Sequence, residues 1–273
     1  MTATMEGRER VGVDHVVAVV LDRAHARFFE VTATETVELP SLHSPAMRGG
    51  KFHSDRQGGP GWGEHDYHGR IREEERRHHA GIVERLIALR RAGPLAGVVL
   101  AGPGSTAAAL RGSLPPALAD QVIGSAKLNP TEVTRARVQE VVRSLQATHQ
   151  RDTERALVSG LLEGLGTGWA ENGTRAVLAA LARRQVRTLL VRSDVRGAGF
   201  RCAGSGRLVL SASDCRSEGD AVPVRDLVGE AIADAQAQDA AIVVVTDTNT
   251  AKAIDGLAAL LRFRQEEVSG RIQ

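Results

Sequence analysis

Short apolar runs of strand length alternate with longer stretches of helical periodicity in the first half of the chain. Three runs near the start, separated by turn residues, predict an opening meander, and the run GVVLA predicts a buried strand before a Gly-Pro-Gly-Ser turn. Strands are therefore expected at 16–21, 26–31, 36–39, 97–101 and 121–124. Helices are expected at about 66–91 and from Thr131, as the N-cap, to about His149.

The second half repeats the alternation from about Asp152 onward. Helices are expected at 153–165, 174–184 and 225–237, and strands at 188–192, 208–211, 241–245 and 258–263. This pattern predicts an α/β protein with two layered α/β domains, in which helices flank mixed sheets. The domains are expected at 14–150 and 151–265, between a flexible N-terminus (1–13) and a flexible tail (266–273).

Residues 40–69 depart from both periodicities. Six of the nine histidines lie between His43 and His79, and seven glycines lie between Gly49 and Gly69. We predict a long loop here, because structureless segments of this length in a compact domain are usually functional or disordered.

The chemistry of this loop suits RNA. Paired glycines let the backbone approach a ligand closely, cationic side chains contact phosphates, and aromatic rings stack on unpaired bases. The expected RNA-binding residues are Arg48, Gly49, Gly50, Lys51, Phe52, His53, Arg56, Trp62, Arg70 and Arg72. The same composition also fits a mobile surface loop that binds nothing. The arginines further along the following helix are interpreted as a solvated face, supported by a Glu73–Arg77 pair.

Two alternatives for the histidines remain open from the residues. His53, Asp55, His65, Asp66 and His68 have the ligand types of a zinc or manganese site, and three of them, His53, Asp55 and His65, would serve a metal-dependent nuclease. Flexible glycines separate His53 from the others, so we expect no metal and no cofactor. The Gly102-Pro103-Gly104-Ser105 turn lacks a P-loop lysine and is interpreted as a tight strand–helix connection.

Composition narrows the class of protein only modestly. The chain is 42% apolar and 25% charged, with 3% aromatic residues and a net charge of +2, which is typical of a soluble globular protein and does not by itself demand nucleic acid. The sequence contains neither a membrane-length apolar run nor a secretory signal. Cys202 and Cys215 are expected to be two small buried or half-buried thiols in a reducing cytoplasm, without a disulfide framework or a zinc site.

The order of these features resembles a known family. A strand pair, a Gly-Gly loop, an Arg-rich helix and then VVLAGPGS are similar to the middle domain of the archaeal and eukaryotic class-1 peptide release factors and Pelota. The stretch from ERALVSGLLEGLG onward and IDGLAALLRF at 254–263 resemble their C-terminal domain. The string GGKFHSDRQGGPGWGEHDYHGRI looks most like the bacterial branch, which includes peptidyl-tRNA hydrolases and the ribosome hibernation factor Balon. The resemblance covers residues 14–264.

The chain departs from this family in two places. Where release factors carry Gly-Gly-Gln, it reads Gly49-Gly50-Lys51, and only about 13 residues precede the first strand, so the N-terminal domain that reads stop codons is expected to be absent. The resemblance implies a cytoplasmic, monomeric, ribosome-binding translation factor. We expect a non-catalytic binder of ribosomal RNA in the A site near the peptidyl-transferase centre, acting in hibernation or in the response to stalling.

Alternatives to the binder and its partners also come from the resemblance. One alternative is a peptidyl-tRNA hydrolase acting in ribosome rescue, for which Gly49, Gly50 and Lys51 would be the catalytic residues. A weaker one is the metal-dependent nuclease. The C-terminal domain is expected to face a translational GTPase such as elongation factor Tu, and no membrane is expected as a partner.

Overall fold

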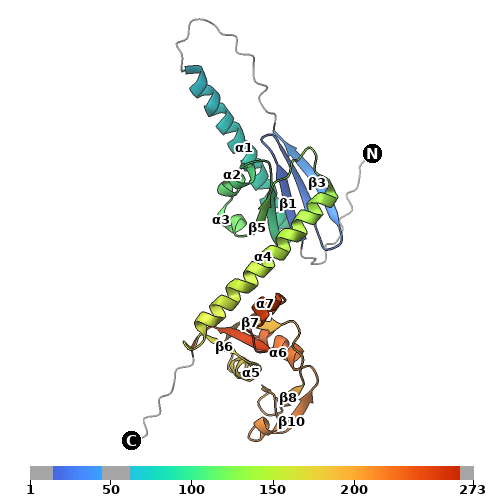
Figure 1. Ribbon diagram of the computed structural model, residues 1–273, viewed down its shortest axis with the longest axis vertical. Helices are drawn as coiled ribbons and strands as arrows, with labels where there is room; N and C mark the ends of the chain where they lie inside the picture. The colour runs from blue at the N-terminus through green and yellow to red at the C-terminus, as the bar shows by residue number, and fades with distance from the viewer. Residues whose placement is uncertain (1–14, 45–61, 265–273) are drawn as a thin grey trace. The chain divides into compact units, whose positions relative to one another are not determined.

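The computed structural model describes residues 15–44 and 62–264. The chain divides into two compact units, residues 1–149 and 150–273, and one helix, α4 (Arg135–Gly164), runs through the division. Figure 1 shows the elements of each unit. The helices and sheets confirm the predicted fold class, a mixed α/β protein whose sheets are flanked by helices.

The first unit is built on a five-stranded sheet of order β3-β2-β1-β4-β5. An antiparallel meander forms one half of it, and two strands parallel to β1 form the other half. The strands are β1 (His15–Leu21), β2 (His25–Val31), β3 (Thr36–His43), β4 (Leu95–Ala101) and β5 (Val122–Ala126). The helices before α4 are α1 (Trp62–Ala92), α2 (Thr106–Ser113) and α3 (Pro116–Ala119).

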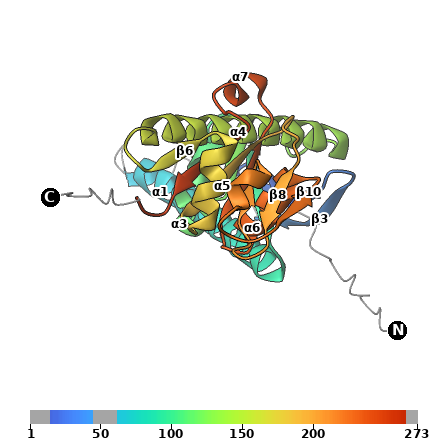
Figure 2. The same ribbon diagram turned by 90° about the horizontal axis from the view of Figure 1, so that it is seen from below.

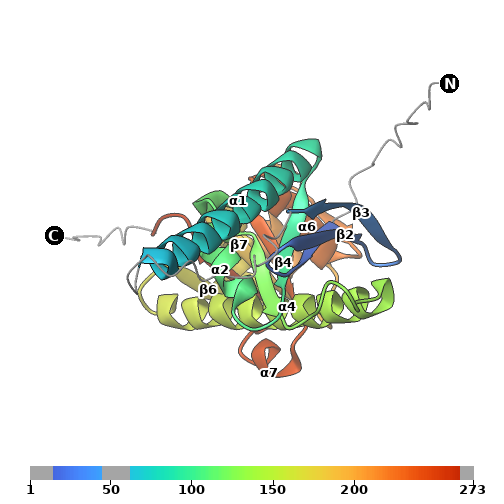
Figure 3. The same cartoon turned by 90° about the horizontal axis from the view of Figure 1, so that it is seen from above.

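Both faces of this sheet are covered, which explains why β1 is a continuous apolar run rather than an alternating one. Val17, Val19 and Leu21 of β1 pack with buried residues of α1 and α2 on one face. Val16, Ala18 and Val20 point to the other face, where the first half of α4 covers them. Figure 3 shows α1 and α4 on opposite sides of these strands.

The second unit contains a four-stranded sheet of order β11-β7-β12-β6 and a separate small sheet of order β10-β8-β9. Its strands are β6 (Ala170–Asn172), β7 (Val186–Arg192), β8 (Gly199–Cys202), β9 (Leu208–Val209), β10 (Ala221–Val224), β11 (Ala241–Val245) and β12 (Leu257–Leu261). Its helices are α5 (Thr174–Ala182), η1 (Ala212–Cys215, a 3-10 turn), α6 (Leu227–Gln236) and α7 (Thr248–Ala251). The larger core packs α5 and α6 against one face of the main sheet, and the second half of α4 covers the other face with α7 (Figure 2).

Two sequence expectations about α4 are corrected by the structure. The helices predicted at 131–149 and 153–165 are a single helix, and its first turn is capped by Thr134, whose hydroxyl accepts a hydrogen bond from the Arg137 N–H, not by Thr131. The polar stretch around residue 150 lacks a helix breaker, so the helix continues through it.

The loop predicted at 40–69 is shorter than expected at both ends. β3 continues to His43, because Pro40 lies on an edge strand, where a missing N–H costs no ladder hydrogen bond. At the other end, α1 already begins at Trp62 rather than near residue 66. The acidic residues Glu64 and Asp66 in its first two turns suit the positive end of a helix dipole, although the stretch has no amphipathic pattern.

Candidate nucleic-acid interface

The predicted RNA-binding residues fall into two groups. Residues 48, 49, 50, 51, 52, 53 and 56 lie outside the described residues, so their predicted contacts stay a prediction. The other three lie on α1. Trp62 is the first residue of this helix, and Arg70 and Arg72 lie further along it. Helix α1 therefore begins directly after residues 45–61, which we call the glycine-rich segment.

The first half of α1 presents cations to solvent. Arg72, Arg76 and Arg77 are exposed. Arg76 and Arg77 share one carboxylate, that of Glu73, at 2.7–2.9 Å, which confirms the predicted Glu73–Arg77 pair. Hydrogen bonding from Arg76, and then from Arg77, lowers the pKa of Glu73. Residues 72–77 carry three arginines and three glutamates, so their formal charges cancel. The guanidinium groups are nevertheless the exposed charges, because Glu73, Glu74 and Glu75 are half-buried.

The helix changes character at a pair of adjacent histidines. His78 and His79 are 1% and 5% exposed, and the fully buried Ile82 and Leu86 follow them. The exposed arginines of α1 thus precede the half of the helix that packs on the sheet. The sequence signal for this transition is a pair of adjacent histidines inside a strongly charged helix, and neither histidine was predicted as a site residue.

Each of these histidines ties α1 to a different neighbour. The Nδ1 atom of His78 lies 2.8 Å from the Oγ atom of Ser44, the last described residue before the glycine-rich segment, and the Ser44 N–H donates to the Ala24 carbonyl at 2.8 Å. His79 Nδ1 lies 3.2 Å from the Oγ atom of Ser113 on α2. Burial lowers the pKa of both imidazoles, and the neighbouring His79 lowers that of His78 further, so both rings are neutral near pH 7.

A second pair of histidines lies at the same sheet edge. His25 and His43 are cross-strand partners with ring centroids 4.6 Å apart. Asp22 holds the turn before β2 by accepting from the N–H groups of Ala24 and His25, both at 2.8 Å. Burial raises the pKa of Asp22, but these bonds outweigh burial and the net shift is downward. The C-terminal end of β3, which leads into the glycine-rich segment, is therefore held by the ionised Asp22 and by the imidazoles of His25, His43 and His78.

The turn after β4 completes this edge. A side chain at Gly102 would meet the Leu21 carbonyl at 2.6 Å, and Gly104 has φ +57°, so the turn needs glycine at both places. The Thr106 hydroxyl donates to the Pro103 carbonyl at 2.8 Å. Residues 22–25 and 103–106 line an open hollow between the two turns. This close backbone packing is the tight strand–helix connection that the sequence predicted.

Comparison with known protein families shows which family the chain belongs to. The family described as bacterial archaeo-eukaryotic release factor family 10 matches residues 12–150, just over half of the chain. The chain belongs to this family. The match confirms the resemblance seen in the sequence and covers the first unit, including the glycine-rich segment and α1. No curated protein matches the chain in sequence.

Solved structures with the release-factor fold resemble the chain beyond that unit. Dom34 of S. cerevisiae, described as a translation termination-like factor involved in RNA quality control pathways and interacting with Hbs1, has a TM-score of 0.55 at 12% identity and covers 92% of this chain. An archaeal Pelota, from a model of ribosome-bound Pelota and ABCE1, has a TM-score of 0.55 at 20% identity and covers 95%. The chain spans 64% of the length of each of these proteins.

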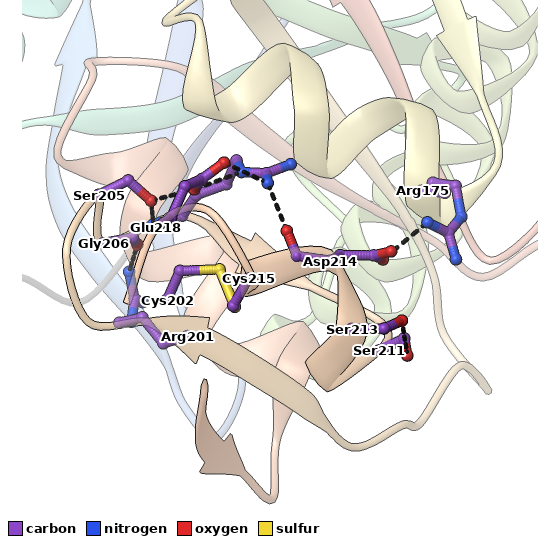
Figure 4. The surroundings of a disulfide bond; sticks show 11 residues. Arg175, Arg201, Cys202, Ser205, Gly206, Ser211, Ser213, Asp214, Cys215 and Glu218 are labelled. Atoms are coloured by element: carbon purple, nitrogen blue, oxygen red, sulfur yellow. Dashed lines mark hydrogen bonds and ion pairs between the residues drawn. A yellow bond between two sulfur atoms is a disulfide. The ribbon is translucent and has the colours of Figure 1, made fainter. Parts of the chain in front are cut away.

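The cysteines of this release-factor family member contradict the sequence expectation. Cys202 and Cys215 form a disulfide with a Cα–Cα distance of 5.2 Å and are 0% and 1% exposed, so the prediction of two free thiols was wrong. The β8–β9 hairpin and the turn of η1 bring the two residues together across 13 positions (Figure 4). A spacing of this kind does not reveal a pairing, because the pairing depends on the hairpin register.

The described residues show neither a metal cluster nor a membrane-spanning helix. Over residues 15–44 and 62–264, the structure contains no group of three or more His, Cys, Asp or Glu that could hold a metal ion. The candidate ligands His53 and Asp55 lie outside those ranges, and the backbone of His65, Asp66 and His68 is part of α1. None of the helices in the described part of the chain has the length and apolar character needed to cross a membrane.

Proposed function

We propose that this chain is a ribosome-binding translation factor of the release-factor type, which places its glycine-rich segment and the exposed arginines of α1, Arg72, Arg76 and Arg77, against ribosomal RNA. The observation that carries the proposal is the exposed arginine stretch of α1, which continues directly from that segment in a member of a release-factor family. Guanidinium groups that face solvent suit phosphate oxygens, and their contribution falls with salt.

We further propose that the protein binds without catalysing peptide release. The support is in the sequence: Lys51 stands where the family resemblance leads us to expect glutamine, and catalysis is sensitive to small displacements of the reacting water. Its site would be the A site near the peptidyl-transferase centre of an idle or stalled cytoplasmic ribosome. The second unit would then face a translational GTPase such as elongation factor Tu, and no cofactor is needed.

Co-sedimentation with 70S ribosomes over a series of salt concentrations tests the proposal. The wild-type chain should co-sediment at low salt, and Arg72→Ala should weaken binding and reduce the slope of log affinity against log salt by roughly 1. Arg76→Ala is compared with Arg137→Ala, because both arginines are exposed and ion-paired three residues from a glutamate. Only Arg76→Ala should weaken binding. Failure to co-sediment at any salt, or equal effects of the two substitutions, would contradict the proposal.

A peptidyl-tRNA hydrolase remains the second candidate, favoured by the Gly49-Gly50 pair. Ribosomes loaded with peptidyl-tRNA distinguish the two. We expect peptide release at the background rate from wild type, with Lys51→Gln as the variant that restores the family's motif. Release by wild type that is lost in Gly50→Ala would establish the hydrolase instead.

A further inference from the structure

The small sheet β10-β8-β9 of the second unit has very little core of its own. Its cluster contains three buried residues, Cys202, Val209 and Cys215, with Phe200 and Ala221 partly buried against them. The bonded cysteines therefore supply two of the three buried positions. The main sheet of the same unit has two larger clusters that contain neither cysteine.

Leu208 of β9 is buried in the core of the main sheet, with Val224 partly buried against that core, and the other links of this lobe, residues 199–224, are polar and partly exposed. Arg207 donates to both carboxylate oxygens of Glu218 and to the Asp214 carbonyl, and Ser205 donates to Glu218 as well. Arg207 and Glu218 are 30% and 28% exposed, so solvent screens their attraction. β9 has two residues, and β10 contains a proline on an edge. Apart from Leu208 and Val224, the remaining contacts of the lobe are therefore weak substitutes for a core.

Two hollows lie between α5 and the small sheet, close in sequence to the cysteines. One is lined by Arg175, Leu178 and Asp214 among others, and the second by Arg201, Arg207 and Glu218 among others. Asp214 directly precedes Cys215, and Arg201 directly precedes Cys202. Figure 4 shows both cysteines beneath this network, with Arg175 reaching Asp214 from α5.

We propose that the Cys202–Cys215 bond is a redox-controlled lock on the lobe: the bonded form holds the face between α5 and the small sheet in shape, and reduction releases the lobe while the main sheet stays folded. The lobe has the properties of a unit that opens locally, since it combines few apolar contacts with exposed ion pairs. This inference rests on the proposed ribosomal function, which places the protein in a reducing compartment. Disulfides are uncommon in such a compartment, and those that occur are mostly transient or redox-sensing.

The chemistry is thiol–disulfide exchange with a dithiol. One thiolate of the dithiol attacks a sulfur of the bond, the S–S bond breaks, and a mixed disulfide forms while the other cysteine leaves as a thiolate. The second thiol of the reductant then displaces the first cysteine. Two electrons and two protons pass from the dithiol to the cysteines, which leaves two thiols and an oxidised reductant. Because both sulfurs are buried, exchange must wait for the lobe to open.

Thiol titration and hydrogen exchange on the full chain test this directly, without ribosomes. Protein purified without reductant should show no titratable thiol until dithiothreitol is added. Reduction should then speed amide exchange in residues 199–224 by about tenfold or more and leave β7 and β12 unchanged. The Cys202→Ser/Cys215→Ser variant should exchange like reduced wild type and be insensitive to dithiothreitol. Two free thiols at the outset, or unchanged exchange after reduction, would overturn the lock.

The rate of reduction provides a second measurement that survives a failure of the double variant to fold. Arg207→Ala removes the clamp on Glu218 and should speed reduction by roughly three- to fivefold, the effect expected of a partly exposed ion pair. Arg137→Ala removes an exposed pair on α4 and should leave the rate unchanged. If the two variants are reduced at the same rate, exchange does not pass through opening of the lobe. Because ribosome binding is not used here, these outcomes are independent of the proposed function.

Discussion

Two buried polar side chains, Glu154 on α4 and His78 on α1, hold chain segments to a sheet in opposite ways. Both are 1% exposed. Glu154 accepts four hydrogen bonds, from the Thr246 N–H and hydroxyl, the Asp247 N–H and the Gln150 amide, at 2.9–3.1 Å. His78 has one, to Ser44. Its Nε2 makes no hydrogen bond of standard geometry with any residue that the structure describes.

The difference follows from what each segment needs. The turn between β11 and α7 leaves two N–H groups to be satisfied, and an ionised carboxylate matches them. The exit of β3 is already held by the Ser44 N–H on the Ala24 carbonyl, so the imidazole adds a single neutral bond. A strong anchor thus fixes a turn of the second unit, and a weaker one adjoins the segment proposed to meet RNA.

The largest effect is expected from Glu154→Ala. The substitution leaves the Thr246 and Asp247 N–H groups without an acceptor, and we expect a loss of about 3 kcal/mol in the free energy of unfolding. Urea unfolding measures the loss, and hydrogen exchange in residues 241–252 locates it. Glu163→Ala on the same helix is the control, since Glu163 is exposed and should change stability by less than about 0.5 kcal/mol. Equal effects of the two substitutions would contradict the claim that the hydrogen bonds to Glu154 stabilise the second unit.

As the pH falls, the stability contributed by His78 and by Glu154 should be lost in different pH ranges. Burial raises the pKa of Glu154, but the bonds from Asp247, Thr246 and Gln150 outweigh it, and the net pKa is lowered. Burial and His79 lower the pKa of His78. In each case the unfolded chain binds the proton more tightly, so acid favours unfolding. Stability from His78 is complete above the ordinary value of 6.5 and is lost below it, and that from Glu154 is lost below 4.5.

Residue-resolved urea midpoints at a series of pH values check these windows. The first unit should weaken before the second as the pH falls. Glu154→Gln, which cannot ionise, should reduce the pH dependence of the second unit in the lower window without removing it, because Glu218 and Asp247 also have a lowered pKa, and it should leave the upper window unchanged. A second unit that weakens first would contradict the assignment.

A smaller change is expected from His78→Leu. The leucine loses the bond to Ser44 but also removes Nε2, which makes no hydrogen bond of standard geometry within the described residues, so stability near neutral pH should stay within about 1 kcal/mol of wild type. What should change is the slope: the variant loses less stability than wild type on acidification through pH 6.5. Free energies of unfolding of wild type and variant, measured on either side of pH 6.5, check this. If His78→Leu keeps the wild-type slope, His78 is not the group that titrates.

The sequence predicted much of this architecture and none of these anchors. The strand at 241–245 coincides with β11, because a long apolar run between polar turns is a local signal. The short strands β6, β8 and β10 were missed, since four residues or fewer carry no periodicity. Glu154 contacts residues more than 90 positions away, and Ser44 lies 34 from His78, so only tertiary structure pairs them. The cationic residues of α1 were found because charge is visible locally.

The most direct test of the contact between His78 and Ser44 is Ser44→Ala, whose effect should be small. One neutral hydrogen bond is removed, so we expect a loss of about 1 kcal/mol. Ser105→Ala is the matched control, because Ser105 is exposed at the N-cap of α2 and its side chain makes no cap bond. Combining Ser44→Ala with His78→Leu should cost no more than the larger single effect, since both remove the same contact. Simple additivity would show that the 2.8 Å contact contributes nothing to stability, and the exit of β3 would then depend on the Ser44 N–H and the His25–His43 stack instead.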